Sequence, residues 1–93
     1  MSITLDIVSP AGRIHHAENL DRVVVVRREA RFDPGSEFAI CTHHAPLLMQ
    51  TQACELRLVA GRSVRRLRVD AGVLEVLGDV VTLAVTGGRS SPG

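Results

Sequence analysis

The chain has 93 residues, which is enough for one hydrophobic core and too few for two. Hydrophobic residues make up 45% and charged residues 23%, a balance that is typical of a folded globular domain and excludes wholesale disorder. The formal net charge of +1 gives no bulk attraction to nucleic acid, and the absence of Trp and Tyr removes most base-stacking side chains, so we expect no nucleic-acid partner.

The N-terminal third of the sequence predicts β-strands. Ile3, Leu5 and Ile7 alternate with less apolar neighbours, which predicts a strand with one buried face, and turn residues at 9–12 end it. A weaker polar segment follows at 13–18, and the nearly unbroken apolar run at 20–26 predicts a strand buried on both faces. No apolar run approaches the roughly 20 residues of a membrane span, and the N-terminus lacks a signal-peptide pattern, so we expect a cytoplasmic protein.

The middle of the chain contains turn signals. Pro34 and Gly35 predict a hairpin or tight corner at 32–36, followed by a short strand at 37–40. Pro46 interrupts any strand ladder, so the segment 43–48 is interpreted as a structured loop. The best helical window, 45–58, contains the same proline and predicts at most a turn or two of helix.

The second half is the most regular part of the sequence. Apolar alternating runs at 55–59, 64–69, 73–77 and 80–85 are separated by short turns that each contain glycine. Such spacing indicates an all-β fold, an antiparallel sandwich or barrel of about 8 to 10 short strands. Residues 87–93 have no apolar content to bury, so we expect one domain over 1–86 and a flexible tail.

Several side chains could in principle bind a metal or act as a nucleophile: His15, His16, His43, His44, Cys41 and Cys54. Adjacent strand residues point to opposite faces, so at most one histidine of each pair could face a common ion, and no zinc-binding motif is present. A nucleophile built from a cysteine and a nearby histidine lacks any sign of an orienting carboxylate or an oxyanion hole. We therefore expect loop histidines, thiols outside any disulfide, no catalysis, and no metal or cofactor.

Two arginine clusters occur, at 65–68 and at 27–31. The cluster at 65–68 is interpreted as a solvated strand face. The cluster at 27–31 fits either a charged hairpin tip or a patch for an acidic protein surface, and the sequence leaves these alternatives open.

Three segments stand in a recognisable order. They are Leu5-Asp6-Ile7-Val8-Ser9-Pro10, His44-Ala45-Pro46-Leu47-Leu48, and Val69-Asp70-Ala71-Gly72-Val73-Leu74-Glu75-Val76 followed by Asp79, Val81 and Thr82. Together they resemble the epsilon subunit of F-type ATP synthases, over nearly the whole N-terminal β-sandwich domain of that family. The resemblance implies a flattened sandwich of two antiparallel sheets, which agrees with the strand pattern above. The helical hairpin that follows this domain in the family has no counterpart here.

The resemblance also implies a function: a non-catalytic rotor subunit of the central stalk, which links the gamma subunit to the membrane c-ring of a proton-translocating ATP synthase. Such a subunit is peripheral on the inner face of the cell membrane, in the F1 sector, and touches the membrane only through the complex. By motif, the ring-facing end would carry Glu37, His43 and His44. The loop behind it would be anchored by Pro46, Leu47 and Leu48.

The sequence also departs from the family pattern. His43 stands where the family usually has a glycine, and the connection from 26 to 35 is longer than usual. These departures and the paired histidines leave an alternative: a stand-alone binding or regulatory module on the same sandwich, such as a metal-handling protein. A small hydrolase using Cys41 and His44 is the third and weakest hypothesis.

Overall fold

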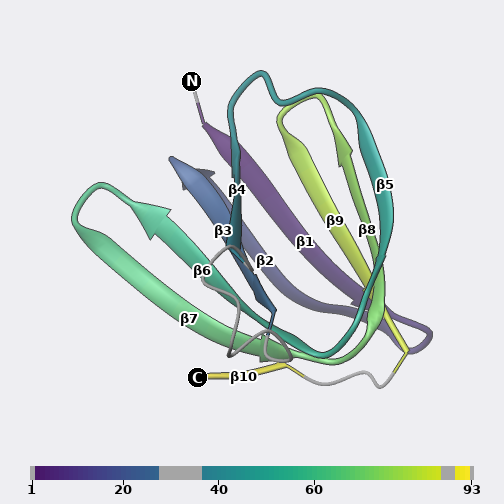
Figure 1. Cartoon of the computed structure of the whole chain (residues 1–93). Coiled ribbons are helices and arrows are strands. Elements are labelled where there is room, and N and C mark those ends of the chain that lie inside the picture. Colours follow the sequence, from purple (N-terminus) through teal and green to yellow (C-terminus); the bar gives the residue numbers. More distant parts are fainter. Residues whose placement is uncertain (1, 28–36, 87–89, 93) are drawn as a thin grey trace.

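The chain forms two β-sheets packed face to face, as the ribbon in Figure 1 shows. The computed structural model describes residues 2–27, 37–86 and 90–92, which contain ten strands and no helix. The strands are β1 (Ile3–Ser9), β2 (Gly12–Leu20), β3 (Arg22–Arg27), β4 (Glu37–Cys41), β5 (Leu47–Thr51), β6 (Cys54–Ala60), β7 (Ser63–Val69), β8 (Gly72–Leu77), β9 (Val80–Val85) and β10 (Ser90–Pro92). The prediction of an all-β sandwich is confirmed, and β5 and β6 occupy the window considered for a turn of helix.

Each sheet has five strands. Sheet A has the order β2-β1-β9-β8-β5, and sheet B has the order β10-β7-β6-β3-β4. Neighbouring strands pair antiparallel with one exception, since β1 pairs with β9 in parallel. The parallel pair joins the first strand of the chain to a much later one, and it brings the N-terminal segment into the middle of sheet A.

The N-terminal strands differ from the expectation in two ways. The polar segment at 13–18 belongs to a full strand, β2, which tolerates polar residues because it lies at the edge of sheet A. In β3, Val23 and Val25 are buried, whereas Val24 and Val26 are only half-buried, so the prediction of burial on both faces is wrong. The reason is that a two-layer sandwich covers each sheet on one side only.

The expected corner at 32–36 lies outside the described residues, although the strands on either side of it pair antiparallel, with Val26 opposite Glu37. The expected end of ordered structure near Val85 is wrong, because Ser90–Pro92 forms β10 and pairs with β7. A short segment without apolar side chains can still join a sheet, since the backbone supplies the ladder hydrogen bonds.

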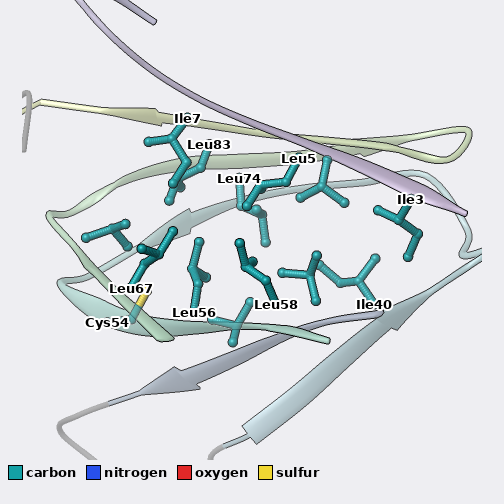
Figure 2. Packing of buried hydrophobic residues seen from close by; sticks show 14 of the residues in the cluster. Ile3, Leu5, Ile7, Ile40, Cys54, Leu56, Leu58, Leu67, Leu74 and Leu83 are labelled. Atoms are coloured by element: carbon teal, nitrogen blue, oxygen red, sulfur yellow. The ribbon is translucent and has the colours of Figure 1, made fainter. Parts of the chain in front are cut away.

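The core lies between the sheets and is apolar throughout, as the close view in Figure 2 shows. Ile3, Leu5 and Ile7 of β1 point into the space between the sheets, where Leu56 and Leu58 of β6 also lie, so the alternation predicted for both strands is confirmed. Among the described residues no polar or charged side chain is buried. Hydrophobic burial therefore stabilises the domain, and its chemistry lies on the surface.

Candidate partner-binding surface

The turn between β4 and β5 carries the two histidines of the sequence motif. His43 adopts a left-handed backbone conformation, with φ of 63°, which explains why a glycine suits this position. Its backbone N–H donates to Oδ1 of Asp79 at 3.1 Å, and Nδ1 of His44 donates to the carbonyl oxygen of Ala45 at 2.7 Å. One hydrogen bond to another hairpin and one within the turn thus fix its backbone, whereas the His43 side chain is exposed.

Asp79 connects three parts of the chain at this end of the sandwich. It lies in the turn between β8 and β9, accepts from the His43 N–H through its side chain, and accepts from the Thr4 N–H through its carbonyl oxygen at 2.9 Å. Sequence reasoning included Asp79 in the motif but gave it no role. The Gly78-Asp79 pair at a hairpin turn is the only local signal for it. We call the end formed by His43, His44 and Asp79 the His43 end.

The structure does not bring Glu37 to the His43 end, which corrects the expectation that one end carries all three residues. Glu37 begins β4 opposite Val26, whereas Cys41 ends β4 before the His43 turn. Four strand steps separate Glu37 from Cys41, a distance of about 13 Å. Glu37 instead pairs with Arg57, with 3.1 Å between Oε1 and Nη1.

The segment expected to anchor the loop is partly the strand β5. Leu47 is half-buried and packs against the core. Leu48 is 69% exposed and Pro46 is exposed, so their expected anchoring role is wrong. The physical reason is strand geometry, since consecutive side chains of β5 point to opposite faces of sheet A.

Four exposed apolar side chains lie around the exposed Glu75 on the outer face of sheet A, in the half formed by β5, β8 and β9. They are Leu48, Leu77, Val80 and Val73, which are 69%, 62%, 44% and 40% exposed, and Leu77 and Val80 flank the Gly78-Asp79 turn of the His43 end. The ladder places Leu77 opposite Val80 on β8 and β9, and the alternating residues of these strands are buried inside. The strands β5, β8 and β9 lie side by side in Figure 1. We call these four residues the sheet A patch, and grouped exposed apolar side chains of this kind mark interaction sites.

The histidines of β2 lie far from the His43 end. The pairs at 15–16 and 43–44 lie at opposite edges of sheet A, four strand spacings or about 19 Å apart, so they do not share an ion. Among the described residues no group of three His, Cys, Asp or Glu side chains is arranged to hold a metal. Cys41 is exposed and Cys54 is buried in the core.

His16 sits between two carboxylates on the outer face of sheet A. Its Nδ1 is 2.6 Å from Oδ1 of Asp6, and its Nε2 is 3.0 Å from Oε1 of Glu18. The hydrogen bond with Asp6, and then that with Glu18, raises the pKa of His16. His15 points the other way, and burial, followed by the charge of Arg65, lowers the pKa of His15. The Asp6–His16 contact links β1 to β2, and His16 and Glu18 line one side of an open pocket of about 450 Å³ that extends to β6 and β7.

The described residues thus form a two-sheet β-sandwich with an apolar core, exposed apolar side chains on one face and ion pairs at the surface. Residues 2–88 match the family model of the ATP synthase delta/epsilon chain β-sandwich domain, and the chain belongs to this family. It is 35% identical over 81 residues to the ATP synthase epsilon chain of Syntrophobacter fumaroxidans, covering 87% of this chain and 55% of that one. It is 40% identical over 89 residues to the epsilon chain of Dehalococcoides mccartyi, covering 95% and 59%.

The fold is also found in solved ATP synthases. A chain of the Euglena gracilis mitochondrial enzyme, solved as an OSCP/F1/c-ring assembly, superposes with a TM-score of 0.75 at 15% identity, covering 98% of this chain and 53% of that one. A chain of the Tetrahymena thermophila mitochondrial central stalk and c-ring gives a TM-score of 0.65 at 11% identity, covering 92% and 64%. The chain spans about half the length of the curated relatives it matches, 55% and 59% for the two above.

Proposed function

We propose that this chain is a non-catalytic rotor subunit in the central stalk of an F-type proton-translocating ATP synthase, where it joins the gamma subunit to the c-ring. It acts on the inner face of the cell membrane and reaches the membrane only through the complex. Family membership supports the proposal, as do structural neighbours that come from central-stalk and c-ring assemblies. None of the described elements is a helix that could cross a membrane.

The sheet A patch is the observation that carries the proposal. A torque-bearing link needs a stiff body and an exposed surface that gains free energy when a partner covers it. Two five-stranded ladders around a core without polar side chains, among the described residues, supply the stiffness. Leu48 and Leu77, both more than half exposed, supply the largest apolar side chains of the patch. In this proposal the patch binds the gamma subunit.

The His43 end takes the second contact in this proposal. The exposed His43 side chain and the half-buried His44 offer imidazole donors and acceptors to polar loops of the ring. Asp79 fixes the backbone that presents them, through its 3.1 Å hydrogen bond with the His43 N–H. A fixed backbone lowers the entropy cost of binding, because the turn is ordered before the partner arrives.

Co-expression with the gamma subunit of the same organism tests the proposal. The two chains should co-elute on gel filtration, and Leu77→Asp should weaken the complex at least tenfold, because it places a charge in the apolar contact. Arg62→Glu, an exposed change in the turn between β6 and β7, is the matched control and should leave binding unchanged. Separate elution of the wild-type chains, or equal affinity of wild type and Leu77→Asp, would refute the proposal.

A further inference from the structure

The outer face of sheet B, on the side opposite the sheet A patch, contains an open groove of about 550 Å³. Its floor is formed by β-branched side chains of three adjacent strands: Val24 of β3, Val59 of β6 and Val64 of β7. Val64 is 55% exposed. We call this feature the sheet B groove.

Three arginines line the sheet B groove. Arg57 lies at its centre and is held by two carboxylates, with Nε 3.2 Å from Oε2 of Glu55 and Nη1 3.1 Å from Oε1 of Glu37. Arg22 of β3 and Arg66 of β7 are exposed on either side. Within residues 2–27, 37–86 and 90–92, no ion pair involves either of these two. Among the described residues, the groove therefore carries two guanidinium groups without an ion-pair partner beside an apolar floor.

The register places two arginines opposite each other across the β6–β7 ladder. Arg66 lies directly opposite Arg57 in the β6–β7 ladder. Like charges at directly opposed positions destabilise a strand pair. The two carboxylates on Arg57 reduce this repulsion and leave Arg66 without a partner among the described residues. A carboxylate supplied from outside would relieve the repulsion and make a charge-assisted hydrogen bond.

We propose that the sheet B groove is a docking surface for an acidic segment of a partner protein, which places carboxylates on Arg22 and Arg66 and an apolar side chain on the valine floor between them. Two strand spacings and one two-residue step along the strands separate these arginines, about 12 Å. This inference goes beyond the proposed function, which uses the opposite face, and it does not rest on that function. It replaces the interpretation of residues 65–68 as a merely solvated strand face.

The charges and the floor favour a protein segment over other anions. The net charge of the chain is only +1, which gives no general attraction to a continuous phosphate backbone. The valine floor gains free energy from an apolar side chain, which an acidic peptide offers and a phosphate does not.

Photo-crosslinking in cells of the organism that makes the protein tests this inference. Cys41 is exposed and lines the sheet B groove, so it is replaced by a photo-crosslinking amino acid. The expected adduct maps to a protein segment with at least two Asp or Glu residues flanking an apolar residue. Nuclease-sensitive adducts, adducts to segments without carboxylates, or no adduct above the dark control would overturn the inference. The same amino acid at Val73, in the sheet A patch, reports separately on the proposed function.

Charge reversal tests whether the crosslinked adduct depends on Arg22 and Arg66. Arg22→Glu with Arg66→Glu should lower the adduct yield about tenfold, because two pairings are lost and two repulsions gained. Replacing the acidic residues of the identified segment by Lys should restore the yield. Far-UV circular dichroism checks folding, and the neutral pair Arg22→Gln with Arg66→Gln takes the place of the Glu variant if that variant unfolds. An unchanged yield in a folded variant, or no restoration by Lys, would also overturn the inference.

Discussion

Gly72 is the position where a single added methyl group should cost the most. It begins β8, between Thr51 of β5 and Val85 of β9. A Cβ atom here would overlap the carbonyl oxygen of Ala84 and lie 2.9 Å from its carbonyl carbon. Both atoms belong to the backbone of β9, so no side-chain rotation can relieve the overlap. Gly72→Ala must push β8 and β9 apart where they pair.

The expected destabilisation follows from the cost of overpacking. Forcing extra atoms into a packed site costs about 1–3 kcal/mol. For a domain of this size each kcal/mol lowers Tm by about 4–8 °C, so we expect a decrease of about 5–20 °C. Urea unfolding followed by far-UV circular dichroism is the suitable assay, because the chain has no Trp or Tyr for fluorescence.

Two further variants isolate the cause. Gly72→Ser should cost as much as Gly72→Ala, since both add the same Cβ atom. Val73→Thr changes the next residue, which is 40% exposed on the outer face, and should change the free energy of unfolding by less than about 0.5 kcal/mol. A free energy of unfolding for Gly72→Ala within 0.5 kcal/mol of wild type would refute the reasoning, since that is about the size of an ordinary surface change.

Three other predictions concern stability. Leu56→Ala should cost about 2–5 kcal/mol in urea unfolding, because Leu56 is fully buried, whereas Leu48→Ala should cost under about 0.5 kcal/mol. His43→Gly should raise the free energy of unfolding by about 1 kcal/mol, and with it Tm, because glycine relieves the strain of the left-handed backbone. An unchanged Tm would contradict this strain. Because the pKa of His16 is raised, its contribution to stability is present below the unfolded pKa of 6.5 and is lost as pH rises through the folded pKa. His16→Gln should therefore make the free energy of unfolding depend less on pH between pH 6 and 8.

The strands that face the core could be predicted from the sequence, because a buried face imposes a period of two. Val81, Leu83 and Val85 of β9 show this pattern and are all buried. The edge strands β2 and β10 could not be found in this way, since their backbones pair with β1 and β7 and most side chains of β2 stay outside the core. Pairing between distant segments, such as the parallel β1–β9 pair, leaves no local trace either.

The surface was less predictable than the fold. The motif indicated the turn at His43, but Asp79, which accepts the hydrogen bond from the His43 N–H, lies 36 residues further on in another hairpin. The opposed arginines of the sheet B groove depend on the register of β6 against β7, which a one-residue slip would destroy. A charged strand face looks the same in sequence whether its arginines are compensated or not.

The two proposed surfaces differ in chemistry and lie on opposite sides of the sandwich. Sheet packing places the faces of a sandwich about 10 Å apart, with buried side chains interlocked between them. Between Leu77 on sheet A and Val64 on sheet B lies a core that, among the described residues, contains no buried polar side chain. A close-packed core has little room to deform, so a force on one face is transmitted to the other. Apolar contact gives affinity on one face, and paired charges set the orientation of the partner on the other. A domain so built can hold two neighbours in fixed relation, which a linker in a turning shaft must do.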